Sequence, residues 1–355
     1  MKPRILAINP GSTSTKLAIF LGTELIFEKT LIHDVSEIKH FNTIYDQLEF
    51  RLETVTNFLK EKSINLDNID LFVGRGGLIS PVESGTYLVN EKMISDLKEA
   101  KYGSHACNLG AIIACDLARS VNKEAYVVDP VVVDELHDVA RVSGLKEIDR
   151  ISVFHALNHK AVAKRYANEI NKKYEELSLI VSHLGGGISV GWHKFGRIVD
   201  VNNALGGDGP FSPERCGDLP IFSLIDLCYS NKYSKDELKK HLIPKGGLVS
   251  YLNTSSGLEI SRRINEGDKE AIFYFKAMAY QIAKEIGSLY FVAKGKIDVI
   301  ILTGGLAYNN HLISFIKEYL PDFINLVIYP GEDEMSALAF GVLRVFEGKE
   351  EVKTY

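Results

Sequence analysis

The sequence is poor in the features that mark secreted, membrane-spanning and nucleic-acid-binding proteins. Only four of its 355 residues are cysteines, and no two of them are spaced as CxxC, which argues against a disulfide framework and against a cysteine-based metal site. The sequence has no run of about 18 apolar residues and no charged-then-apolar leader. Its net charge of −5 argues against nucleic acid and anionic membranes as partners. These absences predict a cytoplasmic protein with reduced cysteines that binds neither nucleic acid nor membrane.

The remaining composition is that of a globular protein with two domains. Apolar residues make up 46% and charged residues 25% of the chain, which is ordinary for a globular fold. A chain of 355 residues exceeds what one core usually supports. We expect an N-terminal domain over residues 1–150 and a C-terminal domain over 151–334, with a last helix, about 335–355, that packs back onto the first domain.

The first hairpin, residues 5–20, has the features of a phosphate-binding turn. Two apolar runs, 5–8 and 17–20, flank a turn of small and hydroxyl residues at 11–15. Small side chains let backbone N–H groups approach a ligand, and Lys16 adds a positive charge. Because the residues after Lys16 form a strand pattern, the motif is not a Walker loop. Taken alone, the stretch fits a polar turn of an ordinary β-hairpin equally well.

A second hairpin with the same order of features begins at residue 179. Its turn contains Gly185, Gly186 and Gly187, and three successive glycines between buried strands indicate that something approaches the backbone closely. A third strand pattern follows each hairpin, at 24–31 and at 197–201. This repetition predicts an internal duplication in which two domains hold the phosphates of a nucleotide between their turns.

Three charged residues stand where they could meet a ligand. Arg75 lies among glycines in a loop after a strand, so it is either an anion binder or a solvated loop charge. Arg215 lies in a long loop rich in glycine and proline, and such loops are usually functional. Asp129 follows the strand 125–128, at the edge where open α/β sheets bind ligands.

Other polar residues leave alternatives open. His155 and His159 are four apart on an expected helix, so a metal pair is conceivable, but no HExxH glutamate accompanies them and His155 could instead donate to a phosphoryl oxygen. The acids at 332–334 precede a helix and are either capping residues or metal ligands. We interpret four further charges as solvated helix residues: Asp134, Glu135, Asp138 and Arg141.

Eight stretches together resemble the acetate and butyrate kinase family, and most closely the butyrate kinases within it. They are NPGSTSTK, GRGGL, VDPVVVDE, FHALNHKA, HLGGGISVG, FSPERCGDLP, ILTGGLAYN and YPGEDEM. The family is part of the sugar kinase, Hsp70 and actin superfamily. The resemblance therefore implies an α/β fold of two duplicated ribonuclease-H-like domains with a nucleotide cleft between them.

The resemblance also implies roles for individual residues. The phosphates of ATP or ADP would be bound by Asn9, Ser12, Ser14, Lys16, His183, Gly185, Gly186 and Gly187, and the adenosine by Gly304, Gly305 and Asn309. The catalytic residues would be Arg75, Asp129, His155 and Arg215. Mg²⁺ would be held by Asn9 and Glu334, with Glu332 or Asp333 as alternatives to Glu334. The acid would be bound by Arg75, Gly77, Ser104, His105 and Phe154.

The implied reaction is butanoate + ATP = butanoyl phosphate + ADP, by direct in-line transfer in a homo-oligomer. A carboxylate is already anionic at neutral pH, so the site needs positive charge and not a strong base. Gly77 and Ser104 are small where acetate kinases of the family have larger residues, which would leave room for additional methylenes. Acetate, propionate and branched acids stay open as substrates. Two other functions also stay open: a hydroxyl kinase with Asp129 as base, and an ATP-driven switch of the Hsp70 or actin type.

Overall fold

The computed structural model describes residues 2–355 and separates into two compact units. The first unit comprises the chain up to Asp134 and again from Asp333 to Tyr355, and the second comprises Glu135–Glu332. The sequence placed this boundary after residue 150. It lies earlier because the segment after Asp134 pairs with the second unit, where the amide of His137 donates to the carbonyl of Val199.

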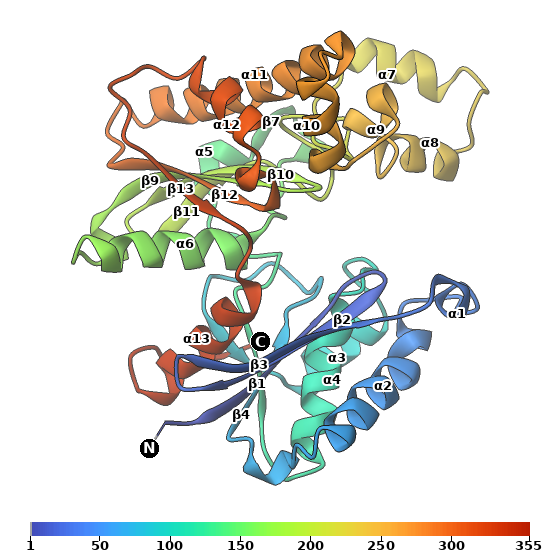
Figure 1. Cartoon of the computed structure of the whole chain (residues 1–355), viewed down its shortest axis with the longest axis vertical. Helices are drawn as coiled ribbons and strands as arrows, with labels where there is room; N and C mark the ends of the chain where they lie inside the picture. Colours follow the sequence, from blue (N-terminus) through green and yellow to red (C-terminus); the bar gives the residue numbers. More distant parts are fainter. Residues whose placement is uncertain (1) are drawn as a thin grey trace. The chain divides into compact units, whose positions relative to one another are not determined.

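A seven-stranded sheet forms the first unit, in the order β14-β5-β6-β4-β1-β2-β3; strands β1 to β4 are labelled in Figure 1. Strands β1, β2 and β3 are antiparallel to one another, and β4 and β6 run parallel to β1. The strands are β1 (Arg4–Pro10), β2 (Ser14–Leu21), β3 (Glu24–Ile32), β4 (Leu71–Arg75), β5 (Thr86–Leu88), β6 (Ala125–Val128) and β14 (Lys353–Thr354).

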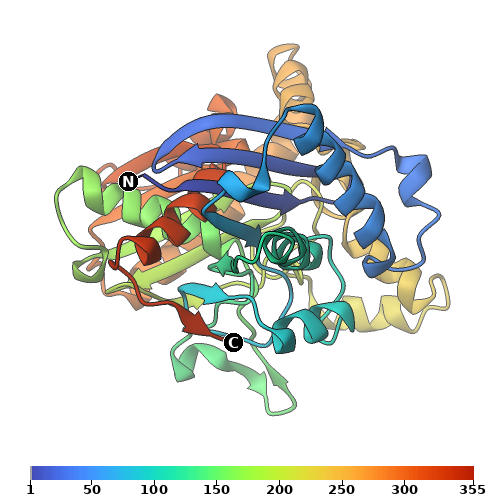
Figure 2. The same cartoon turned by 90° about the horizontal axis from the view of Figure 1, so that it is seen from below.

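Helices cover both faces of this sheet (Figures 1 and 2). They are α1 (Val35–Ile38), α2 (Leu48–Glu61), α3 (Glu91–Lys98), α4 (Asn108–Arg119) and α13 (Glu334–Phe346). Alternation along β4 directs neighbouring residues to opposite faces. A side chain at Gly74 would collide with the Gly110 carbonyl of α4, whereas the next residue, Arg75, reaches Glu334 at the start of α13.

The second unit repeats the strand order of the first. Its five-stranded sheet has the order β11-β10-β9-β12-β13, with β9, β10 and β11 antiparallel and with β12 and β13 parallel to β9. This matches β3-β2-β1-β4-β6 strand for strand, so the predicted duplication is confirmed. The strands are β9 (Ser178–Leu184), β10 (Ile188–Lys194), β11 (Arg197–Val201), β12 (Val299–Gly304) and β13 (Leu326–Pro330), beside a separate hairpin of β7 (Val142–Leu145) and β8 (Ile148–Asp149).

Two apolar cores lie on the two faces of the second sheet. Val181 and Val299 pack toward α6 on one face, and Ile180 and Leu302 pack toward α11 on the other, as period-two alternation requires. His183 therefore shares the α6 face with Val181. The helices are α5 (Asp138–Arg141), α6 (Ala156–Glu169), α7 (Ile221–Cys228), α8 (Lys235–Leu242), α9 (Gly247–Leu252), α10 (Gly257–Asn265), α11 (Lys269–Val292) and α12 (Asn310–Lys317).

The four cysteines have free thiols, and two of them, Cys107 and Cys115, are buried. Burial raises the pKa of Cys107 to about 11, so this thiol stays protonated at neutral pH and acts as a packed side chain. Across residues 2–355, no helix has both the length and the apolar character that a membrane span requires.

Candidate functional site

Three of the predicted residues meet at one edge of the first sheet, and we call Asn9, Arg75 and Glu334 the glutamate cluster. Asn9 comes from β1, Arg75 ends β4, and Glu334 begins α13. Nδ2 of Asn9 donates to Oε2 of Glu334 at 2.6 Å, and the Arg75 guanidinium forms an ion pair with Oε1. The side chains of Arg75 and Glu334 are only 8% and 18% exposed, so solvent screens the pair little. The sequence placed Arg75 in a loop; it is a buried strand residue.

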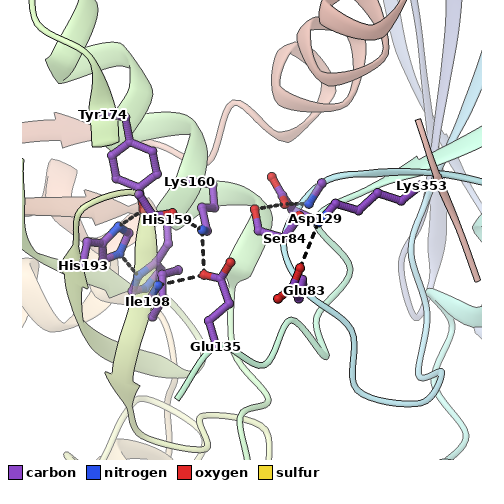
Figure 3. Close-up of polar contacts among 12 residues, drawn as sticks. Glu83, Ser84, Asp129, Glu135, His159, Lys160, Tyr174, His193, Ile198 and Lys353 are labelled. Atoms are coloured by element: carbon purple, nitrogen blue, oxygen red, sulfur yellow. Dashed lines mark hydrogen bonds and ion pairs between the residues drawn. The ribbon is translucent and has the colours of Figure 1, made fainter. Parts of the chain in front are cut away.

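Asp129 lies beside this cluster in the order of the strands, because β6 pairs with β4 in a register that sets Val128 opposite Arg75. Its backbone has φ +39°, the left-handed region, which an aspartate tolerates better than most residues. Oδ1 of Asp129 accepts hydrogen bonds from Oγ of Ser84 at 2.6 Å and from the amide of Gly85 at 2.8 Å (Figure 3). These two donors fix the orientation of the carboxylate.

The first turn connects β1 to β2. Ser12 is exposed, and Ser14 and Lys16 are half-buried. Lys16 lies directly opposite Asn9 in the register, so the two side chains leave the same face of the sheet. Nζ of Lys16 pairs with Glu28 at 3.1 Å, an exposed ion pair of the kind that contributes little to stability.

In the second unit, five of the predicted residues surround the turn between β9 and β10. We call His183, Gly185, Gly186, Gly187 and Arg215 the glycine-turn cluster. The guanidinium of Arg215 occupies the space that a β-carbon on residue 187 would need. A β-carbon on residue 185 would stand 2.9 Å from Nε2 of His183. A side chain at residue 185 or 187 would therefore have to displace His183 or Arg215.

Arg215 is held inside the second unit without a complete set of acceptors. Nη1 donates to the carbonyl of Ala204, and in the described part of the chain the buried Nε has no hydrogen-bond partner. Burial lowers the pKa of the guanidinium below its usual value. A half-buried cation with an unused donor is suited to receive an anion.

The ring of His155 stacks on the ring of His183, with centroids 3.8 Å apart and planes 12° from parallel. Nδ1 of His155 and Nε2 of His159 each lie 2.9 Å from Oγ of Ser189. The two predicted helix-face histidines thus share a serine hydroxyl. Among residues 2–355, no group of three or more histidine, cysteine or acidic side chains is placed to hold a metal ion.

A row of buried polar groups continues inward from Ser189. Nδ1 of His159 lies 3.2 Å from Nε2 of His193, and Nδ1 of His193 lies 2.8 Å from the hydroxyl of Tyr174 (Figure 3). Burial, with nearby positive charge, lowers the pKa of His159 and of His193 well below the usual value. Both imidazoles are therefore neutral at pH 7. Because a neutral imidazole donates from one ring nitrogen and accepts at the other, the tautomer of one histidine determines that of the next.

One buried ion pair contradicts the sequence interpretation of Glu135 as a solvated helix residue. Nζ of Lys160 lies 2.8 Å from Oε2 of Glu135, and the two side chains are 1% and 6% exposed (Figure 3). The carboxylate also accepts from the amide of Ile198, and the ammonium donates to the carbonyl of Gly196. These further bonds explain why the pair can be buried. The contact joins positions 25 residues apart, and no local pattern announced it.

The residues predicted to bind adenosine follow β12. Gly304 has φ +89°, and a β-carbon there would collide with the Leu184 carbonyl. Nothing lies within 4 Å of the corresponding position on Gly305, so a ligand could approach its backbone. Oδ1 of Asn309 caps α12, and Nδ2 donates to the Gly257 carbonyl and to Ser261. The Asn309 side chain therefore connects α10 to α12.

The residues predicted to bind the acid have mixed placements. The proposal that Gly77 leaves room for methylenes is wrong, because a β-carbon there would stand 2.6 Å from Asn108 and 2.7 Å from Leu97; the glycine permits close packing against α4. Ser104 and His105 are exposed, and Nδ1 of His105 lies 3.0 Å from Sγ of Cys107. Phe154 is buried, with its ring edge-on to His159.

Comparison with known proteins shows the family of the chain. A family model described as the Acetokinase family matches residues 144–323. Butyrate kinase 2 of Clostridium acetobutylicum is 53% identical over 355 residues and 100% of both chains, and Butyrate kinase 1 of the same organism is 53% identical over 352 residues and 99% of both. The crystal structure of Porphyromonas gingivalis acetate kinase aligns with a TM-score of 0.76 at 17% identity, over 96% of this chain and 99% of that one, which shows a shared two-domain fold. The chain belongs to the acetokinase family.

Proposed function

We propose that the protein is an ATP-dependent kinase that phosphorylates the carboxylate of a short-chain fatty acid, with butanoate as the preferred acid. The products are butanoyl phosphate and ADP. The observation that carries this proposal is the 53% identity to two butyrate kinases over essentially the whole chain. The two clusters supply the cationic groups that such a reaction needs.

The main obstacle to this reaction is the repulsion between two anions. A carboxylate is ionised at neutral pH and needs no general base, but it must approach a charged γ-phosphoryl group. Arg75 would clamp the acid, and Arg215 would meet the transferring phosphoryl group. Arg215 supports this role because its guanidinium lies over the glycine turn and its buried Nε donor is unused, and such a donor stabilises charge that develops in the transition state.

Asp129 and His155 would support the transfer from fixed positions. Two hydrogen bonds hold Asp129, so it is suited to orient a neighbouring cation. Nδ1 of His155 lies 2.9 Å from Oγ of Ser189, a contact that orients the ring, and His155 would donate to a phosphoryl oxygen. The acid itself would contact Ser104, His105 and Phe154 in addition to Arg75.

Backbone turns would bind the nucleotide. In the first unit Asn9, Ser12, Ser14 and Lys16 would contact its phosphates, and in the second unit the glycine-turn cluster would do so. The adenosine would lie against Gly304, Gly305 and Asn309, where Gly305 has open space beside its backbone.

The glutamate cluster fits Mg²⁺. This ion prefers oxygen ligands and is usually bound by one or two carboxylates together with substrate phosphates. Glu334 supplies a carboxylate, and Asn9 donates to it through Nδ2, which leaves its amide oxygen as a second ligand. When bound, Mg²⁺ would neutralise charge on the β- and γ-phosphates. Oε1 of Glu332 lies 3.5 Å from Nε2 of His183 in the second unit. Of the acids at 332–334, Glu334 is therefore the better candidate for a magnesium ligand.

The choice of butanoate now depends on the relatives, because the Gly77 argument failed. Acetate, propionate and branched acids are therefore part of the test, as are hydroxyl compounds such as glycerol and glucose. The homo-oligomer and the cytoplasmic location stay predictions.

The test is the release of ADP from Mg-ATP in the presence of each compound, measured as kcat/KM. We expect the highest value for butanoate and about background for the hydroxyl compounds. A higher value for acetate would overturn the chain-length proposal. Turnover of glycerol or glucose alone would indicate a hydroxyl kinase, and slow hydrolysis that no acid accelerates would indicate an ATP-driven switch.

A further inference from the structure

Arg51, on α2, is completely buried beneath the first turn. Its exposed fraction is 0%, and it is among the largest side chains that the fold buries fully. The guanidinium donates to three carbonyls of the turn, those of Gly11, Ser12 and Ser14, each at 2.9 Å. Its other acceptors are Oε1 of Gln47 and Oγ1 of Thr15. Every donor direction of the guanidinium is thereby used.

These bonds determine which way the peptide groups of the turn face. In a trans peptide the N–H points opposite to the C=O. Because the carbonyls of Gly11 and Ser12 point at Arg51, the amides of Ser12 and Thr13 point away from it. Both residues are exposed, and within residues 2–355 their amides donate to no acceptor. Successive outward amides of this kind form an anion-binding concavity.

The charge of Arg51 has no carboxylate partner within the described part of the chain, since all its acceptors are neutral. Burial lowers the pKa of Arg51 to about 10, so it remains protonated at pH 7. Its buried neighbour His33 bonds to Oγ1 of Thr15 at 2.8 Å, and burial together with the charge of Arg51 lowers the pKa of His33 to about 4. The space under the turn therefore carries one net positive charge. A buried cation without a counter-charge is unfavourable, and an anion on the turn would relieve it.

We propose that Arg51 is a positioning residue that shapes the first turn for the phosphates of ATP and supplies a buried charge that the bound phosphates offset. The inference depends on the proposed function in one respect, that the first turn is a phosphate site. A purely structural role would make Arg51 matter for folding alone. The two roles differ in what they predict for ligands that have phosphates and ligands that have none.

The test compares ATP with adenosine, which lacks phosphates, in Arg51→Lys, Arg51→Met and a control. Arg344→Met is the control, because Arg344 pairs with Glu350 in the same unit and contacts neither turn. Dissociation constants for ATP come from calorimetry, and those for adenosine from competition. Thermal melting without ligand reports folding.

We expect Arg51→Met to weaken the binding of ATP about tenfold to a hundredfold, the usual effect of losing hydrogen bonds to a charged group. The dissociation constant of adenosine should change less than about twofold. Arg51→Lys keeps the charge but has fewer hydrogen-bond donors. Its dissociation constant for ATP should lie between those of wild type and Arg51→Met. Arg344→Met should lower the melting temperature without changing the ratio of the two constants. If Arg51→Met does not fold, Arg51→Lys alone decides the matter.

ATP binding within about twofold of wild type in the folded Arg51 variants would overturn the inference, and so would equal losses for ATP and adenosine. The outcome is separable from that of the proposed function. Suppose that the wild-type protein makes no acyl phosphate, but that the Arg51 variants bind ATP more weakly and adenosine equally well. This inference would then stand, and only the proposed reaction would be wrong.

Discussion

The guanidinium of Arg215 lies over Gly187, in the space that a β-carbon on residue 187 would occupy. The absence of a side chain at residue 187 thus allows the Arg215 guanidinium to lie at this position. We expect Gly187→Ala to displace Arg215 and to lower kcat about 10²-fold, since small misplacements of a reacting group have effects of that size. Steady-state kinetics at saturating substrate would measure it.

Gly287→Ala is the matched control for this substitution. Gly287 is inside α11, and nothing lies within 4 Å of its missing β-carbon. The variant should keep wild-type kcat and gain up to about 1 kcal/mol of stability from the better helix propensity of alanine. Wild-type kcat in Gly187→Ala would contradict the placement of Arg215.

A second prediction concerns the hydroxyl shared by His155 and His159. Ser189→Ala removes the group that holds Nδ1 of His155, so we expect kcat to fall about tenfold, in keeping with the loss of one buried partner. Ser182→Ala is the control, because Ser182 is equally buried and its hydroxyl has no partner in the described part of the chain. That variant should keep its kcat and its stability. Equal effects of the two substitutions would exclude a positioning role for Ser189.

A third prediction concerns the buried pair of Lys160 and Glu135. Lys160→Met removes the buried ammonium that pairs with Glu135, and we expect it to lower the free energy of unfolding by about 3–5 kcal/mol. The double variant with Glu135→Leu should recover much of this loss, because it also removes the buried carboxylate. Urea unfolding measures both. A double variant no more stable than Lys160→Met would show that the pair is not coupled in this way.

A fourth prediction is a loss of stability in mild acid. Burial lowers the pKa of His33 to about 4 and that of His159 and His193 well below the usual value. The unfolded chain therefore binds more protons than the folded one below its histidine pKa of about 6.5. Stability is complete above about pH 6.5 and is lost as pH falls through the folded pKa values.

The check is the urea midpoint at pH 7.5 and pH 5, with His193→Gln as the comparison. Removing one titrating group should flatten the dependence on pH, because each full proton of difference contributes about 1.4 kcal/mol per pH unit. A urea midpoint that is higher at pH 5 than at pH 7.5 would contradict the prediction that the buried histidines are neutral.

Much of the fold was predictable because local patterns determine it. Alternating strands around glycine turns showed both hairpins, and β6 and β11 have the bounds that the sequence indicated. In the glutamate cluster, Arg75 stood out from its place after a strand, whereas the resemblance to the family implied Asn9 and Glu334. The sequence could not show that Arg75 is buried against Glu334, because that contact joins positions 259 apart.

The remaining errors involve charges and glycines whose surroundings come from distant segments. Glu135 read as a solvated helix charge, which is the usual state of such residues, and nothing in the sequence singled out Arg51, yet each is buried by partners that no local pattern shows. Gly77 read as open space beside a substrate, but α4 fills that space. Small size in a sequence does not distinguish a cavity from close packing.

The most direct test of the account is the product itself. Purified protein with Mg-ATP, butanoate and hydroxylamine should form one butanohydroxamate per ADP, because hydroxylamine traps acyl phosphates. Arg215→Ala should lower both rates about 10³-fold, as expected for an arginine on the transferring phosphoryl group. Release of ADP without hydroxamate, or near-normal turnover in Arg215→Ala, would contradict the account.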